Sequence, residues 1–510
     1  MTGNAQRILI FGGIVCACLT YAGLRFWAEL DQPAAVTAAV TTLCALWWCT
    51  EAIPIAVTAL LPFVMFPLCG VLDDQQLAAA YGDDLVLLFL AGFIISKAAE
   101  KSKTHLRVAH GMLRLLGTGS QRRLVLGFML APAVCSMWIS NAATALIMLP
   151  VALAALEQQK DRRLEAPLLL AVAYGCSIGG MATIIGTPPN AVFVGVYRDF
   201  TDKSVDFLSW MAVGAPVTVL MLIAAGALLT RGLGRGSEYE LQDLGPWKPA
   251  QRRMLLVLGC TALLWMLRKS PAGGWSAWLG NAAISPEHYA GDATIGLAAV
   301  VLMFLIPSGE VDKEGRSTAL LDWETAVRIP WGILLLFGGG LAIASAFQST
   351  GLGELIGANL AMLQHFPPIL IIGVICLAVT FLTELTSNTA TTTLLMPILA
   401  AAAQGAGLEP AVLMAPAALS ASCAFMLPVA TPPNAIVFGS NRLTIPQMAR
   451  PGFVLNLIGV VVITGVCYFV VDFEHGIGSP AEKAAPVETT AESPSEPAPD
   501  SPPQTDKAAP

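Results

Sequence analysis

The sequence predicts an all-α membrane protein that crosses the bilayer many times and carries an internal repeat. Of its 510 residues, 55% are hydrophobic and 12% are charged, and soluble globular proteins carry about twice that charged fraction. Apolar runs close to the ~20 residues that cross a bilayer as a helix recur along the chain. Two nearly identical polar signatures interrupt these runs, one in each half, and indicate a duplication.

The duplicated signature has two parts. Residues 140–144 read SNAAT and residues 387–391 read SNTAT, an offset of 247 (387 − 140). Residues 187–190 and 431–434 both read TPPN, an offset of 244 (431 − 187). Small residues are common wherever membrane helices pack closely, but close packing does not predict a constant spacing. We therefore interpret the halves as repeats of one unit, an organisation typical of transporters.

The apolar runs predict about eleven transmembrane helices. Several runs are shorter than a full crossing or contain glycine and proline, so we expect short or broken helices among them. The predicted spans cover residues 8–28, 36–53, 55–71, 84–98, 166–195, 210–230, 253–268, 293–307, 330–348, 409–439 and 452–472.

Two further apolar segments, 124–157 and 367–403, predict re-entrant hairpins. Each is too short for two crossings of ~20 residues plus a turn. Basic residues are dense on both sides of the first segment and absent beside the second, so the first hairpin opens to the cytoplasm and the second to the outside. Five spans lie between them, which makes the repeat inverted. This topology predicts a cytoplasmic N-terminus and an external C-terminus.

The polar residues at the hairpin tips suit an anion and a cation together. A carboxylate that leaves water needs new hydrogen-bond donors, which hydroxyls, amide N–H groups and helix N-termini supply. A sodium ion needs oxygens from side chains or from carbonyls freed where a helix breaks. The prolines of each TPPN lack an N–H group, so the helix should open near Gly186 and Ala430.

The residues that are missing exclude other chemistries. Eleven cysteines are scattered without a C-x-x-C pair, so neither a disulfide framework nor a zinc site is predicted. No acid or histidine lies inside either motif, which disfavours a proton relay. Glu384 precedes the second motif as a coupling residue or a structural brace, and we prefer the brace. No cluster of acids, histidines or an activated nucleophile predicts an enzyme, and two hairpins around one closed site suit a carrier better than a channel.

Paired Ser-Asn-Thr motifs, each followed by Pro-Pro-Asn, resemble the divalent anion/sodium symporter family of dicarboxylate, citrate and sulfate carriers. The resemblance covers about residues 36–472 and includes WCTEAIP at 48–54 and IPWGILL at 329–335. It implies a homodimer in a bacterial-type plasma membrane, in which a scaffold domain holds a transport domain that moves like an elevator.

With this resemblance the chain divides into five parts. Residues 1–83 form N-terminal scaffold helices, and 84–230 form the first inverted repeat. Residues 231–329 form a cytoplasmic linker and further scaffold helices, and 330–473 form the second inverted repeat. Residues 474–510 are rich in Pro, Ala, Glu and Ser, so we expect this tail to be disordered.

The resemblance also implies the ligands, which we carry over by motif. No cofactor is implied beyond sodium as the coupling ion, and no nucleic acid as partner. One sodium ion would be bound by Ser136, Ser140, Asn141 and the carbonyl near Gly186, and the second by Thr383, Ser387, Asn388 and the carbonyl near Ala430. The carboxylates would be bound by Asn141, Thr187, Asn388, Thr389, Thr431 and Pro432.

One departure from the family motif concerns the substrate. Ala142 stands where the motif has threonine, and losing a hydrogen bond to a charged group costs roughly 1.5–3 kcal/mol, or about ten- to a hundredfold in affinity. Either the substrate differs, or a water or a hydroxyl such as that of Thr144 compensates. We expect sodium-coupled symport of a C4 dicarboxylate such as succinate, malate or fumarate. The alternatives are a sodium-independent dicarboxylate exchanger and a sodium-coupled citrate or sulfate carrier.

Overall fold

The computed structural model describes residues 3–116, 119–159, 161–234, 244–268, 274–275, 291–311, 314–360, 366–471 and 477. The predicted disordered tail, 474–510, lies outside the described residues except for Ile477. Within them the fold is almost entirely helical, as predicted. One antiparallel hairpin of β1 (Pro307–Val311) and β2 (Ser317–Ala319) lies in the predicted linker, and the sequence had not indicated it.

Seven helices precede the first hairpin; they cover the first four predicted spans and add two short helices, α5 and α7. Asp73 and Asp83 accept hydrogen bonds from the first turns of α5 and α6, which explains why these helices begin after them. The helices are α1 (Gly3–Ala22, continued by a π-helical turn Gly23–Trp27), α2 (Gln32–Thr50), α3 (Ile55–Thr58), α4 (Leu61–Leu68), α5 (Asp74–Tyr81), α6 (Asp84–Ser102) and α7 (Thr104–Leu116).

The first repeat contains the predicted helical hairpin and then a broken helix. The helices α8 (Gln121–Ser136) and α9 (Asn141–Gln159) form the hairpin. The break lies between α10 (Arg162–Gly180) and α11 (Pro188–Thr201), with one 3-10 turn (Ile184–Gly186) between them. The helix α12 (Phe207–Leu229) closes the repeat.

The second repeat has the same order of elements. After α13 (Pro249–Met266), α16 (Asp292–Leu305) and α17 (Trp323–Ala326) come α18 (Trp331–Ser349), α19 (Leu352–Leu360) and the hairpin α20 (Pro368–Leu382) with α21 (Asn388–Gly405). The broken helix follows as α22 (Ala411–Ala421) and α23 (Pro432–Phe438), and α24 (Ile445–Val470) ends it.

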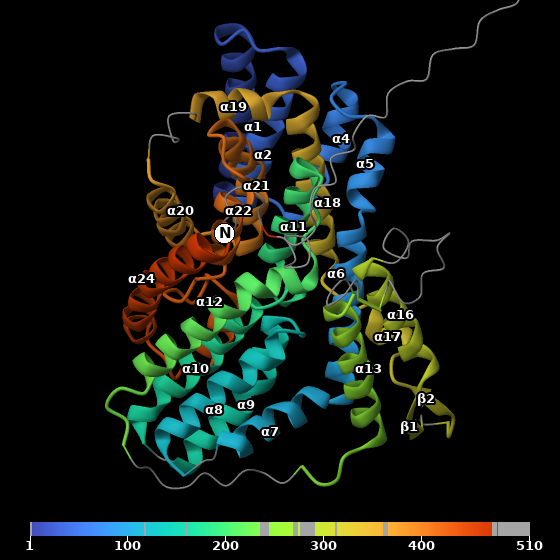
Figure 1. The fold of residues 1–510 in the computed structure, drawn as a ribbon, viewed down its shortest axis with the longest axis vertical. Coiled ribbons are helices and arrows are strands. Elements are labelled where there is room, and N and C mark those ends of the chain that lie inside the picture. The colour runs from blue at the N-terminus through green and yellow to red at the C-terminus, as the bar shows by residue number, and fades with distance from the viewer. Residues whose placement is uncertain are drawn as a thin grey trace, which may run out of the picture.

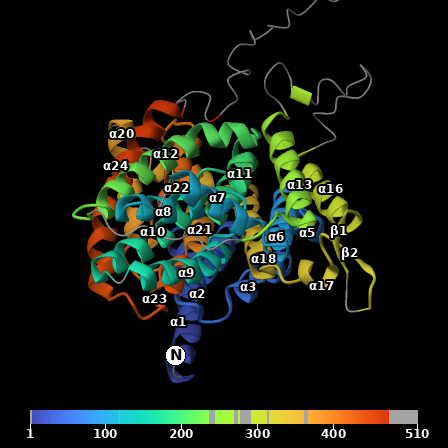
Figure 2. The same cartoon turned by 90° about the horizontal axis from the view of Figure 1, so that it is seen from below.

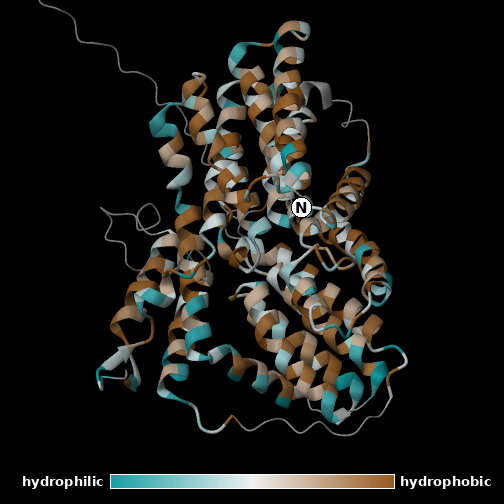
Figure 3. Cartoon of the chain, turned by 180° about the vertical axis from the view of Figure 1, so that it is seen from behind, coloured by the Kyte–Doolittle hydropathy of each residue, from teal (hydrophilic) through white to brown (hydrophobic). Residues whose placement is uncertain are grey.

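The apolar helices agree with a polytopic membrane protein. Among the described residues, seven helical segments are long and apolar enough to cross a bilayer, and four shorter apolar helices accompany them. Residues with hydrophobic colour run along most helices, and hydrophilic ones lie mainly near helix ends (Figure 3). The predicted number of about eleven counted the short and broken helices as crossings.

The helices of the two repeats surround a shared interior. In two perpendicular views, α20 and α24 lie on one flank and α13, α16 and the β-hairpin on the opposite flank (Figures 1 and 2). Large aromatic side chains are fully buried between the helices, among them Trp48, Tyr174, Trp210 and Phe425.

Glycines allow the first hairpin to pack closely against the broken helix. Gly175 and Gly179 stand one turn apart on α10 and face the backbone of α8: a Cβ atom added to Gly179 would lie 2.2 Å from the carbonyl oxygen of Ala133, and one on Gly175 would lie 2.3 Å from that of Met129. Small residues four apart are typical of such close helix contacts in membranes.

Adding a methyl group at this contact should destabilise the protein. We expect Gly179→Ala to force α8 and α10 apart at a cost of about 1–3 kcal/mol, seen as a lower melting temperature in detergent. Gly259→Ala is the matched control, since nothing lies within 4 Å of its added Cβ and alanine favours a helix. Equal melting of the Gly179→Ala variant and the parent protein would contradict this packing.

Candidate functional site

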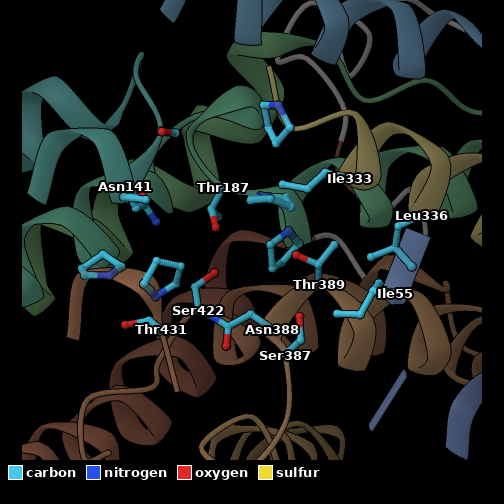
Figure 4. A pocket seen from close by; sticks show the side chains of 18 of the residues that line it. Ile55, Asn141, Thr187, Ile333, Leu336, Ser387, Asn388, Thr389, Ser422 and Thr431 are labelled. Atoms are coloured by element: carbon cyan, nitrogen blue, oxygen red, sulfur yellow. The ribbon is translucent and has the colours of Figure 1, made fainter. Parts of the chain in front are cut away.

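A cavity of about 1050 Å³ lies where the two hairpin tips meet the two helix breaks. Figure 4 shows Asn141 and Thr187 from the first repeat on one side, facing Ser387, Asn388, Thr389, Ser422 and Thr431 from the second. The cavity thus joins residues 247 positions apart in the sequence.

Most of the predicted ligands line this cavity. Ser136 and Thr383 do not line it, but each contacts the motif asparagine of its own repeat from behind. Ala142, the departure from the motif, also lines the cavity. The lining residues that the sequence predicted are Ser140, Asn141, Gly186, Thr187, Ser387, Asn388, Thr389, Ala430, Thr431 and Pro432.

Oxygen atoms cluster behind the first hairpin tip. The Ser136 hydroxyl donates to the Cys176 carbonyl at 2.7 Å and contacts the amide oxygen of Asn141. With the Asn141 amide turned so that its nitrogen faces this group, the nitrogen donates to the carbonyl oxygens of both Gly186 and Cys176 at 3.2 Å. The one Ser136 hydroxyl proton cannot satisfy the three neighbouring oxygens, and the turned Asn141 amide supplies the missing donors. Uncharged side-chain and carbonyl oxygens are what sodium requires, so the residues present fit that ion.

The second repeat repeats this arrangement. The Thr383 hydroxyl lies within donating distance of two acceptors, the amide oxygen of Asn388 at 2.7 Å and the Ala421 carbonyl at 3.0 Å. Thr383 follows Ser136 by 247 residues, and Ala421 follows Cys176 by 245. We call these two clusters the first half-site (Ser136, Asn141, Cys176, Gly186) and the second half-site (Thr383, Asn388, Ala421). Ala430, the counterpart of Gly186, lines the cavity.

The asparagine of each TPPN holds its helix break in shape. The Asn190 amide donates to the carbonyls of Gly180 at 3.2 Å and Thr183 at 2.8 Å. The Asn434 amide donates to the carbonyls of Ala424 and Leu427, both at 3.0 Å. Both side chains are fully buried. They satisfy carbonyls that the interrupted helix leaves without an N–H partner.

Glu384 braces the second helix break, which is the role that we preferred for it over a coupling residue. Its carboxylate, 3% exposed, accepts hydrogen bonds from the backbone N–H groups of residues 425, 426 and 427 at 2.7, 2.8 and 3.0 Å. The Asn456 amide donates to it at 2.8 Å. The first repeat has Met137 at the equivalent position, and there the Thr183 hydroxyl donates to the Met137 carbonyl at 2.6 Å. Apart from the shared asparagines, the two breaks are therefore held by different groups.

Aromatic rings and a tight backbone contact fix the first hairpin tip. Trp138 lines the cavity and stacks on Phe207 at 5.8 Å between ring centroids, and Phe207 stacks on Trp265 at 5.3 Å. A Cβ on Gly180 would lie 2.9 Å from both the Gly186 carbonyl and the Asn141 amide oxygen. Only glycine at position 180 leaves room for the first half-site.

The sequence missed several cavity residues. Ser177 and Ser422 line the cavity, and extending the repeat from the motifs would have found them, since they stand 245 residues apart. Glu51 directly follows α2, has a φ of 48° and also lines the cavity. Thr144, named as a possible replacement for the missing hydroxyl, is buried and absent from the lining.

Comparison with known proteins agrees with this architecture. Residues 15–471 match the family model described as the sodium:sulfate symporter transmembrane region. The chain is 38% identical over 471 residues to the sodium-dependent dicarboxylate transporter SdcS of Staphylococcus saprophyticus, covering 88% of each chain. It is 38% identical over 493 residues to SdcS of Staphylococcus aureus, covering 92% of each.

Two solved structures share the fold at low sequence identity. The YdaH transporter of Alcanivorax borkumensis superposes with a TM-score of 0.58 at 14% identity, covering 88% of this chain and all of that one. MtrF of Neisseria gonorrhoeae, described within a class of antimetabolite efflux pumps, superposes with a TM-score of 0.56 at 14% identity, covering 86% and 95%.

Removing the Glu384 carboxylate should destabilise the second break. We expect Glu384→Ala to leave three backbone N–H groups and the Asn456 amide without an acceptor, at about 1–3 kcal/mol for each unsatisfied group. Glu384→Gln keeps one acceptor oxygen and should lose less. Melting temperatures in detergent measure both, and Asn4→Ala on the exposed face of α1 is the control. Melting of Glu384→Ala at the parent's temperature would show that the carboxylate is no brace.

Proposed function

This chain belongs to the sodium:sulfate symporter family, and we propose that it is a secondary active transporter coupling sodium entry to uptake of a C4 dicarboxylate. Succinate, malate and fumarate are the proposed substrates. The observation that supports this proposal most is one cavity bounded by hydroxyls and amides of both repeats, with a matched hydroxyl, asparagine and helix carbonyl behind each hairpin tip. The family and the similar proteins are transporters, so the prediction that the chain is not an enzyme is confirmed.

The cavity offers a dianion uncharged donors only. Among the described residues its lining contains no lysine, arginine or histidine, and its one carboxylate is that of Glu51. The helices α9, α11 and α21 begin at cavity residues Asn141, Pro188 and Asn388. Their positive dipole ends favour carboxylates. Hydroxyls of Thr187, Thr389 and Thr431 add neutral donors.

Without a fixed positive charge in the lining, sodium is the natural counter-ion of the substrate. Two sodium ions at the two half-sites would neutralise a dianion before it leaves water. A dianion entering a negative-inside cell works against about 2.3 kcal/mol per charge per 100 mV. Two sodium ions cancel that electrical work and supply their concentration gradient, and a third would make the cycle electrogenic. We therefore propose that sodium binds first and that at least two ions accompany each substrate.

The same proposal includes the assembly and the movement. We place the protein in the plasma membrane with its N-terminus in the cytoplasm, as a homodimer whose hairpins and broken helices move as one transport domain. The order of elements, hairpin followed by broken helix in each repeat, supports a single moving unit around the cavity.

A second candidate substrate class follows from Ala142. This residue lines the cavity where the family motif supplies a hydroxyl, so the first half of the pocket has one donor fewer. A sodium-coupled citrate or sulfate carrier would use the same half-sites, and a sodium-independent dicarboxylate exchanger would use the same pocket without them.

Uptake into proteoliposomes tests the proposed function. We expect an inward sodium gradient to drive accumulation of radiolabelled succinate well above the level in choline, because sodium supplies both the counter-charge and the driving force. Citrate, sulfate and 2-oxoglutarate serve as competing substrates in the same assay. Counterflow of succinate at full rate in sodium-free vesicles would instead identify an exchanger.

The half-sites make a separate prediction about sodium. We expect Ser136→Ala and Thr383→Ala each to raise the sodium concentration for half-maximal uptake about tenfold, the effect of losing roughly one hydrogen-bond-sized contact to a charged ligand. Thr380→Ala is the matched control, since Thr380 is buried on the same helix and does not line the cavity. An unchanged sodium dependence in both variants would remove these hydroxyls from the half-sites.

A further inference from the structure

Two hydroxyl groups in the cavity have no role in the function proposed above. Ser177 and Ser422 both line the cavity, and each is 2% exposed. Their hydroxyl oxygens are buried and have no hydrogen-bond partner among the described residues. A buried hydroxyl without a partner destabilises a protein unless a ligand completes it.

The two serines occupy equivalent places in the two repeats. They stand 245 residues apart (422 − 177), within the range of offsets that relates the motifs. Ser177 follows Cys176, whose carbonyl accepts from Ser136 and lies 3.2 Å from the side-chain amide of Asn141. It therefore belongs to the half of the cavity that contains Asn141 and Ala142.

Ser422 belongs to the other half of the cavity. It follows Ala421, whose carbonyl accepts from Thr383. Figure 4 shows the Ser422 side chain in the space between Thr431 and Asn388. Repetition of the same residue type beside both half-sites is not expected of serines that merely fill space between helices.

Helical serines and threonines usually satisfy themselves. Their hydroxyls donate to the carbonyl four residues earlier, as Thr41 does to Thr37 at 2.7 Å and Thr261 to Val257 at 2.8 Å in this protein. Ser177 lies inside α10 and makes no such bond. Several other buried hydroxyls among the described residues also lack a partner, but of this set only Ser177 and Ser422 line the cavity.

We propose that Ser177 and Ser422 bind the substrate, each donating its hydroxyl to one carboxylate, and that Ser177 replaces the hydroxyl missing at Ala142. The identity of the ligand as a carboxylate rests on the proposed function. Thr389 already supplies a motif hydroxyl in the second half, so Ser177 contributes more to affinity than Ser422. Thr144 lies outside the cavity lining, so it does not replace the missing hydroxyl.

Alanine variants measure the contribution of each serine. At saturating sodium, Ser177→Ala should raise the KM for the transported anion about ten- to a hundredfold, and Ser422→Ala should raise it less. Stabilisation of the purified protein by the anion, read as a shift in melting temperature, should fall in the same order. Thr144→Ala and Ser420→Ala are the controls: Thr144 ends the first motif and Ser420 stands two residues before Ser422. Both hydroxyls are buried without a partner among the described residues, and neither residue lines the cavity.

A rescue experiment tests the replacement directly. Adding Ala142→Thr to Ser177→Ala restores a hydroxyl to the first half of the cavity, so the double variant should recover most of the lost affinity. The same Ala142→Thr change alone should improve affinity much less. Failure of the double variant to recover would overturn the replacement.

Further outcomes separate this inference from its rivals. An unchanged KM in Ser177→Ala overturns it, and so does a raised sodium requirement with an unchanged anion KM, because the hydroxyl would then bind the cation. If Ser177→Ala does not fold, Ser177→Cys keeps the volume with a weak donor and should show the same loss.

The proposed substrate can fail independently of the serines. Melting shifts are therefore measured with succinate, citrate and sulfate in turn. Stabilisation by citrate or sulfate but not by succinate overturns the dicarboxylate proposal, while loss of that shift in Ser177→Ala still supports the role of the hydroxyl. If none of the three stabilises the parent protein in sodium, both proposals are wrong.

Discussion

Satisfying backbone hydrogen bonds where no water is present is the constraint on which this structure depends. A helix that stops inside a membrane leaves carbonyl and N–H groups that lipid cannot satisfy. Here the fully buried amides of Asn190 and Asn434 and the carboxylate of Glu384 take over those groups. With the breaks held in this way, the carbonyls of Gly186 and Ala430 can stay beside a polar cavity instead of inside a continuous helix.

The two halves of the cavity are related but not interchangeable. Both have an asparagine at a hairpin tip, a hydroxyl behind it and a helix-end carbonyl that accepts from this hydroxyl. The second half has Thr389 and the brace Glu384, whereas the first has Ala142, Met137 and the close approach of Gly180 to Gly186. A ligand with two similar ends would therefore meet one end of the cavity that is richer in hydroxyls than the other.

The sequence predicted the architecture because the need to satisfy backbone groups in a membrane produces recognisable sequence patterns. Paired prolines after a polar motif located both breaks, and the offsets of 247 and 244 residues aligned the repeats. The helices α5, α7 and α19 and the β-hairpin were missed, because such short elements have neither a long apolar run nor a fixed spacing. The roles of Asn190 and Asn434 in stabilising the helix breaks were also missed. The sequence shows that an asparagine is present, but only the folded structure shows which carbonyls its amide contacts. The sequence has no comparable pattern that identifies the substrate, because the single substitution at Ala142 changes the hydrogen-bond donors of the cavity without changing the fold.

The central claim is that sodium supplies the positive charge that the cavity lacks. Calorimetric titration of succinate into the purified protein, at increasing sodium and constant ionic strength with choline, tests it most directly. The account predicts no measurable succinate binding in choline and an affinity that rises steeply with sodium, because each half-site must be filled before a dianion leaves water. Succinate binding with the same affinity in choline and in sodium would contradict it.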